Sequence, residues 1–182
     1  MSARAAWRLE SLGLSPVYRY VAGKLDWFAF ALPMEGEFAD IPKAGDVVRR
    51  DVPICVLTDR VGEVYQRCQA AGWKVCIVVN ESRIVLGRLR REVWEADPET
   101  PVENVMEEGP TTFRPDHFLE PLVKRMRDKK VGSVIVTNPE GALFGILYRK
   151  DAEEHLQKEL PGKEGAEKND GEEQVSARYH RR

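Results

Sequence analysis

The sequence predicts a mixed α/β fold, of the α+β kind, in which two similar units follow one another along the chain. Three observations carry this prediction. They are an ungapped internal repeat, short β-rich runs such as VCIVV at 75–79, and turns rich in Asn, Pro and Gly between those runs. The chain has 182 residues, which is enough for one ordinary domain with appendages.

The repeat has a constant offset along the chain, with Gly87 in RIVLGRLRREVWEA aligned with Gly145 in ALFGILYRKDAEE. The same offset pairs Arg67 with Arg125, Ile77 with Ile135, Asn80 with Asn138, Leu89 with Leu147, and Glu95 with Glu153. Two copies are too few for a solenoid, but they suit a pseudo-symmetric pair.

Each copy predicts the element order β-α-β-β-α. Apolar residues at helical spacing follow Asp59 in the first copy and Asp116 in the second, and both aspartates are candidate N-caps. In the first copy, the extended piece, helix and two strands are expected at 53–56, 61–71, 73–79 and 84–89. In the second, the extended piece, the two strands and the last helix are expected at 111–114, 131–137, 142–147 and from 151 onward. Two such units pack best with their sheets together.

The second copy carries a specific combination of motifs. An apolar-Met pair precedes a P-T-T strand, PD opens a helix, and an N-x-x-G turn leads to Gly-apolar-apolar-x-x-x-Asp. With these motifs, residues 102–154 resemble a CBS (cystathionine β-synthase) domain, and residues 46–96 resemble a more divergent first copy. The resemblance implies a compact tandem pair that binds adenosine-containing ligands between its halves and is not an enzyme. AMP, ADP, ATP or S-adenosylmethionine would then be a regulatory ligand, with no catalytic cofactor.

The candidate ligand-binding residues are Thr111, Thr112, Gly145, Tyr148, Arg149 and Asp151. By resemblance, Asp151 is the ribose position and the Thr111–Thr112 strand borders the adenine pocket. Independently, the Asp151 carboxylate offers two oxygens to a vicinal diol, and Gly145 lets a backbone or a flat base approach its strand. Arg149 is a candidate for neutralising phosphate. Tyr148 either stacks on a base or blocks the pocket.

Plainer interpretations stay open for this site. Asp151 alone as an N-cap is worth about 1 kcal/mol of helix stability, and Gly145 alone relieves packing. The first copy has Val93 where the second has Asp151, so at most one cleft is equipped with a ribose anchor. The alternative function is a ligand-free structural module that mediates dimerisation.

The N-terminal stretch has a different character. It contains SARAA before a helix, then LGL, VYRY, GKLDW and ALPMEG, and it resembles the C-terminal part of a rhodanese sulfurtransferase domain. That chemistry needs a low-pKa cysteine just before the SARAA-type helix, where this chain has Met1 and Ser2, so no catalytic residue is assigned. A rhodanese remnant is a third alternative. We expect the segment to dock on the CBS pair, because its many aromatics would otherwise form a large apolar patch.

The predicted organisation is a rhodanese-like appendage at 1–37, a linker at 38–49, a divergent CBS unit at 50–96, a second CBS unit at 97–160 and a disordered tail at 161–182. We expect a homodimer with a possible protein partner. The 28 Lys and Arg residues balance 30 Asp and Glu residues, which argues against nucleic acid as a partner.

The sequence shows neither a membrane-spanning apolar run nor a signal pattern, so we expect a cytoplasmic protein. Cys55, Cys68 and Cys76 show no metal-ligand spacing and are expected to be small buried hydrophobes.

Overall fold

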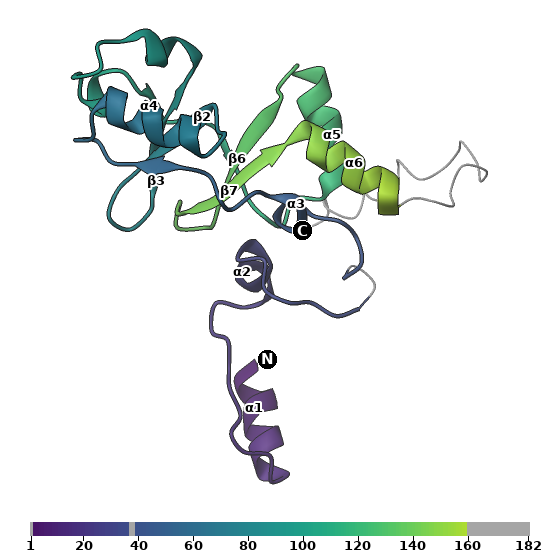
Figure 1. The fold of residues 1–182 in the computed structure, drawn as a ribbon. Coiled ribbons are helices and arrows are strands. Elements are labelled where there is room, and N and C mark those ends of the chain that lie inside the picture. The colour runs from purple at the N-terminus through teal and green to yellow at the C-terminus, as the bar shows by residue number, and fades with distance from the viewer. Residues whose placement is uncertain (1, 37–38, 160–182) are drawn as a thin grey trace.

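Two β-sheets, one in each repeated unit, form the framework of this computed structural model, which describes residues 2–36 and 39–159 (Figure 1). The strand orders are β1-β2-β3-β4 and β5-β6-β7. The strands are β1 (Ile54–Cys55), β2 (Val75–Val79), β3 (Val85–Arg90), β4 (Glu107–Glu108), β5 (Thr112–Phe113), β6 (Ser133–Thr137) and β7 (Leu143–Tyr148). The helices are α1 (Ser2–Ser11), α2 (Lys24–Ala29), α3 (Ala44–Val47), α4 (Val61–Ala70), α5 (Leu119–Asp128) and α6 (Arg149–Glu159), with the 3-10 helices η1 (Arg91–Glu95) and η2 (Val102–Asn104).

The predicted repeat is confirmed by the element boundaries. α4 and α5, β2 and β6, and β3 and β7 all begin and end at the offset that aligns Gly87 with Gly145. The strand registers repeat in the same way, because Ile77 pairs with Arg88 in the first sheet and Ile135 pairs with Ile146 in the second. The mixed α+β fold expected from the sequence is therefore present.

The two copies differ in their last element. α6 is an α-helix of 11 residues, whereas η1 in the first copy is a 3-10 helix of five. The segment after η1 reads ADPETP, and its prolines at 98 and 101 disfavour helical backbone in the residues before them. The first unit therefore lacks most of the helix that completes the second.

The predicted N-caps are wrong. α4 and α5 begin after Arg60 and Phe118, and neither residue makes a side-chain capping hydrogen bond. The Asp59 carboxylate instead accepts hydrogen bonds from the backbone N–H of Val56 and from the Arg67 guanidinium. Asp59 therefore stabilises the loop before α4, and Arg67 extends this contact to the body of the helix.

β2 and β6 are buried on both faces, which explains their continuous apolar sequences. In β2, Cys76 and Val78 pack in the helix-side core of the first unit, while Ile77 and Val79 point to the opposite face. That second face belongs to a core between the two sheets, formed by Val52, Ile77, Val79, Ile135, Leu143 and Ile146. The two sheets therefore pack against each other, as predicted.

The segment that precedes each unit packs on the other unit. Residues 44–49 pack on the second unit, and residues 102–108 pack on the first. The backbone of Arg49 exchanges two hydrogen bonds with Ile146 of β7, with N–O distances of 2.8 and 2.9 Å, and Ala44 is buried in the helix-side core of the second unit. In the same way, β4 pairs with β3, and Val102 is buried in the helix-side core of the first unit. Residues 44–49, which fall within the predicted linker, are therefore structural parts of the second unit.

Gly145 is required by this exchange. A Cβ at Gly145, whose φ is +154°, would lie 2.2 Å from the carbonyl oxygen of Arg49 and 2.9 Å from Cγ2 of Val48. At the equivalent Gly87, a Cβ would lie 2.6 Å from Sδ of Met106 and 3.0 Å from the carbonyl oxygen of Glu107. The glycine of each strand thus makes room for the crossing segment of the other half.

The N-terminal segment does not dock as expected. Figure 1 shows α1 standing away from the two sheets, and Trp7, Tyr18 and Leu25 are 66%, 87% and 84% exposed. α2 lies nearer to the sheets, and a Cβ at Gly45 would lie 3.3 Å from the Cβ of Ala31, just after α2. Within the segment, the Tyr20 ring packs edge-on against Trp27 with ring centroids 5.2 Å apart. The aromatics are therefore covered only in part, and by one another. The predicted disordered tail lies outside the described residues.

The cysteine prediction is confirmed. Cys55, Cys68 and Cys76 are unpaired and at most 3% exposed in the core of the first unit. The Cys76 thiol hydrogen-bonds to the sulfurs of Cys55 and Cys68, and this bonding, together with burial, raises the pKa of Cys76. No group of His, Cys, Asp or Glu side chains in residues 2–36 and 39–159 could hold a metal ion.

We predict that Gly145→Ala destabilises the protein by about 3 kcal/mol, because a methyl group would collide with the Arg49 backbone and Val48. The matched control is Gly132→Ala, where a Cβ meets no atom within 4 Å, and a change below about 0.5 kcal/mol is expected there. Chemical denaturation of both variants measures the difference. Equal stabilities would contradict the close approach of the crossing segment.

Candidate functional site

The predicted ribose carboxylate lies where β7 passes directly into α6. Tyr148 is the last residue of β7 and Arg149 is the first of α6, so Asp151 sits in the first helical turn rather than at the N-cap. A carboxylate in this position interacts favourably with the partial positive charge at the N-terminus of the helix. The N-cap interpretation of Asp151 is therefore wrong, although its charge still suits the helix.

Asp151 is held by Arg49 of the crossing segment. The guanidinium donates two hydrogen bonds to the carboxylate, from Nε to Oδ2 at 2.6 Å and from Nη2 to Oδ1 at 3.0 Å. The side chain of Asp151 is 23% exposed and that of Arg49 is 52% exposed. The hydrogen bond and charge of Asp151 raise the pKa of Arg49. The carboxylate thus faces a bidentate cation rather than bulk water.

Tyr148 fills the space between the two units next to this ion pair. Its ring packs against Trp73 of the first unit, with centroids 6.1 Å apart, and the Arg49 guanidinium lies 5.2 Å from the ring centroid. Burial raises the pKa of the Tyr148 phenol. Arg49 and Tyr148 of the second unit and Trp73 of the first therefore lie together at the junction next to Asp151, which we name the cleft beside Asp151.

The threonine strand lies on the far side of the second sheet from this cleft. Thr112 of β5 pairs with Ile135 of β6, and Ile135 pairs on its other side with Ile146 of β7. Two strand spacings separate Thr112 from β7, or about 10 Å. The structure brings Gly145, Tyr148 and Asp151 to one place, and it puts Arg49 rather than Thr111 or Thr112 beside them.

Arg149 points to a different partner. Its Nε lies 3.8 Å from Oε1 of Glu153, and the same carboxylate oxygen accepts a 2.6 Å hydrogen bond from Arg127 of α5. Arg149 therefore belongs to a group of charges between α5 and α6. Its backbone N–H donates to the carbonyl oxygen of Gly132, the residue before β6.

The pseudo-equivalent cleft of the first unit is built with the charges reversed. Glu107, which the repeat aligns with Arg49, accepts hydrogen bonds from Arg88 at 2.6 and 2.8 Å and from Arg90 at 3.0 Å. These bonds, chiefly those from Arg88, lower the pKa of Glu107. Val93, at the position of Asp151, is partly buried against the first core. This cleft has no carboxylate equivalent to Asp151.

Sequence reasoning missed Arg49 because its partnership with Asp151 spans 102 residues. A signal was nevertheless present. The repeat aligns Arg49 and Arg50 with Glu107 and Glu108, so equivalent positions carry opposite charge. Opposite charges at equivalent positions of a repeat indicate that the two positions have different charged partners. In the structure, these partners are Asp151 for Arg49 and Arg88 for Glu107.

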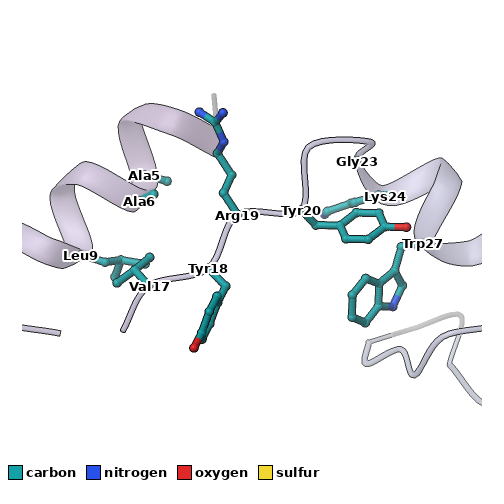
Figure 2. A pocket seen from close by; sticks show the side chains of 10 residues that line it. All are labelled: Ala5, Ala6, Leu9, Val17, Tyr18, Arg19, Tyr20, Gly23, Lys24 and Trp27. Carbon is teal, nitrogen blue, oxygen red and sulfur yellow. The ribbon is translucent and has the colours of Figure 1, made fainter. Parts of the chain in front are cut away.

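A separate pocket of about 360 Å³ lies within the N-terminal segment (Figure 2). Figure 2 shows Ala5, Ala6 and Leu9 of α1 on one side and Lys24 and Trp27 of α2 on the other, with the extended residues 17–20 between them. The Tyr20 hydroxyl donates to Oδ2 of Asp26 at 2.5 Å, which raises the pKa of Tyr20. The pocket is mainly apolar.

In the part of the chain that is described, no helix is long and apolar enough for a membrane span.

Comparison with known proteins gives a family match for part of the chain. The CBS domain model matches residues 97–158, and no curated protein matches significantly. The resemblance of the N-terminal segment to a rhodanese domain gains no support from these matches.

Several solved structures are similar to the chain. The cytosolic domain of the Mg²⁺ channel MgtE in complex with ATP has a TM-score of 0.57 and 24% identity, over 62% of this chain and 48% of that one. The CBS domains of a transcriptional regulator from Streptococcus pneumoniae have a TM-score of 0.57 and 19% identity, over 63% and 99%. The CBS domain pair of protein MJ0100, in complex with 5′-methylthioadenosine and S-adenosyl-L-methionine, has a TM-score of 0.56 and 14% identity, over 65% and 98%.

The match to the MgtE domain spans about half the length of that chain, and identities in this range establish the fold alone. The repeated elements, the matching strand registers and the exchanged segments of this chain agree with that fold. Residues 97–158 therefore contain a CBS domain, and the chain has the fold of a CBS domain pair.

Proposed function

We propose that the chain is a regulatory module that binds an adenosine-containing ligand in the cleft beside Asp151. The observation that carries this proposal is the Asp151 carboxylate, which is 23% exposed and is held at the junction of the two units by Arg49. Two similar structures contain such ligands, ATP in the MgtE domain and S-adenosylmethionine in MJ0100. AMP, ADP, ATP and S-adenosylmethionine are the candidate ligands, and none of them would act as a catalyst.

The ligand would exchange places with Arg49. A ribose diol can donate two hydrogen bonds to the carboxylate oxygens that Arg49 now occupies. A half-exposed ion pair contributes at most about 1 kcal/mol, so its displacement costs little. Once released, the Arg49 guanidinium is suited to bidentate contact with a phosphate of the same ligand.

The base would take its position from Tyr148 and Trp73. Both are aromatic and partly buried, and they come from different units. A planar base that stacks on either ring would contact both halves of the molecule. Arg49 lies in the segment that crosses between the units, directly after α3 and paired with β7. Release of its side chain by a ligand would therefore change the contacts of this segment and so affect the positions of α3 and β7.

We expect at least one of AMP, ADP, ATP and S-adenosylmethionine to raise the melting temperature at millimolar concentration. A ligand at about 100 times its dissociation constant adds about 2.7 kcal/mol to the stability of the native state. Asp151→Asn should abolish the rise. The matched control is Asp59→Asn, because Asp59 also pairs with an arginine and is 26% exposed. The absence of a shift with all four compounds would contradict the proposal.

Arg49→Gln should separate the two proposed roles of Arg49, which are competition with the ribose for Asp151 and contact with a phosphate of the ligand. With its competitor removed, Asp151 should bind uncharged adenosine about two- to fivefold more tightly, as expected from the modest strength of a half-exposed ion pair. The preference for ATP over adenosine should fall at the same time. Isothermal titration of both ligands measures these changes, with Arg67→Gln as the matched arginine control at 56% exposure. Unchanged adenosine affinity would mean that Arg49 does not compete for the site.

A second candidate function is a ligand-free module that mediates dimerisation. It is favoured by the side chains that fill the cleft. Tyr148 packs on Trp73, and Arg49 already donates hydrogen bonds to the Asp151 carboxylate. We expect a homodimer in this case, with the same sedimentation behaviour for the wild type and Asp151→Asn and no response to adenosine compounds. Analytical ultracentrifugation with and without ATP tests this. A monomer under both conditions would remove the second candidate.

The rhodanese-remnant alternative has no structural counterpart among the described cysteines. All three lie in the core of the first unit, remote in sequence from α1 and buried from solvent. A sulfur carrier needs an accessible thiolate. The described residues therefore give no cysteine to which a sulfurtransferase step could be assigned.

A further inference from the structure

A second pocket, which we call the aromatic pocket, lies on the outer side of the first unit. It has a volume of about 430 Å³ and is lined by Tyr65, Gln69, Trp73, Lys74, Arg91 and Trp94. These residues come from the end of α4, the segment that leads into β2, and η1. The volume falls within the usual range for small-molecule sites. None of the residues that form the cleft beside Asp151 lines it, except Trp73.

The pocket exists because the two copies of the repeat are completed differently. In the second unit, Ala152 of α6 is fully buried against α5, and Arg127 bonds to Glu153 at 2.6 Å across the two helices. At the equivalent positions of the first unit, Trp94 replaces Ala152 and Gln69 replaces Arg127. In the second unit, a small residue on a full α-helix packs closely against α5. In the first unit, the bulky Trp94 ring on the short 3-10 helix η1 leaves a space next to α4.

The rings of the aromatic pocket are fixed by their own contacts. The Trp94 ring lies against Tyr65, with centroids 5.4 Å apart at an angle of 38°, and its Nε1 donates to the carbonyl oxygen of Lys74 at 3.4 Å. The amide of Gln69 donates to the Tyr65 hydroxyl. Trp73 is held from its other side by Tyr148. Aromatic surfaces positioned in this way are ready to receive a planar ring.

The charge of the pocket has one sign. Lys74 and Arg91 line it, and no carboxylate does. Neither cation forms an ion pair with any residue in the described ranges. Arg91 also has a φ of +43°, a left-handed conformation that non-glycine residues adopt at a cost and that is frequent at ligand sites. Two cations beside three aromatic rings favour an anion that carries an aromatic ring.

We propose that the aromatic pocket binds a small planar aromatic anion. The ring lies against Tyr65, Trp73 and Trp94, and the carboxylate or phosphate group lies beside Lys74 and Arg91. Apart from Trp73, which packs on Tyr148, this site is formed by residues outside the cleft beside Asp151, and the proposal does not rest on the ligand proposed for that cleft.

The test uses 2-naphthoate and 2-naphthyl phosphate as probes and 2-naphthalenemethanol as their uncharged counterpart. Indole N–H signals of the full chain, followed by NMR during titration, report on Trp7, Trp27, Trp73 and Trp94 separately. Saturable shifts are expected for Trp73 and Trp94 only. The two anionic probes distinguish a carboxylate site from a phosphate site. The uncharged probe should bind at least about tenfold more weakly, because it lacks the charge-assisted contacts.

Variants test the charge requirement. The double variant Lys74→Gln/Arg91→Gln removes two exposed side chains and should weaken binding of the anionic probes at least about tenfold. Lys129→Gln/Lys158→Gln removes two exposed charges from the second unit and should leave binding unchanged. Asp151→Asn should also leave it unchanged, which separates this site from the adenosine cleft.

Three results with the probes and the charge variant would overturn the proposal, and a fourth concerns Asp151→Asn. The first three are a lack of saturable shifts at Trp73 and Trp94 with either anionic probe, equal affinity for the uncharged probe, and unaltered affinity in the Lys74→Gln/Arg91→Gln variant. Loss of probe binding in Asp151→Asn would likewise contradict an independent pocket. None of these outcomes depends on whether ATP or AMP binds in the cleft between the units.

Discussion

The approach of the Val48–Arg49 backbone to Gly145 is the constraint on which the rest of the structure depends. Two backbone hydrogen bonds fasten this segment to β7, and they form only because the strand has no Cβ at that point. The same contact brings the Arg49 guanidinium to Asp151 and over the Tyr148 ring. One close approach thus fixes both the joining of the two units and the chemistry of the cleft between them.

The pseudo-symmetry of the pair is close in the backbone and broken in the side chains. Arg49 and Glu107 occupy equivalent positions, yet one binds an acid of the following helix and the other binds arginines of the neighbouring strand. The two equivalent places therefore differ in the sign of the charge that the crossing segment presents. The difference between η1 and α6 breaks the symmetry again on the outer side, where it leaves the aromatic pocket open.

The sequence was sufficient to predict the repeat, the main strands and helices that the two units share, and the buried cysteines, because these depend on local periodicity and on apolar runs. The α-helix predicted at the end of the first unit was wrong, because the 3-10 helix η1 lies there. It also singled out Gly145, Tyr148 and Asp151, which lie along β7 and in the first turn of α6. The role of Arg49 was not predicted, since it depends on an exchange of segments that no local pattern records. The caps of α4 and α5 were also missed, because hydrogen bonds within the preceding loop took the Asp59 carboxylate instead.

The exchange of segments also determines how the molecule loses its structure. Without residues 44–49, β7 would present an unpaired edge, and without β4 the same would happen to β3. Each half is therefore incomplete as an isolated polypeptide, although each has its own helix-side core. The two halves should melt as a single cooperative entity.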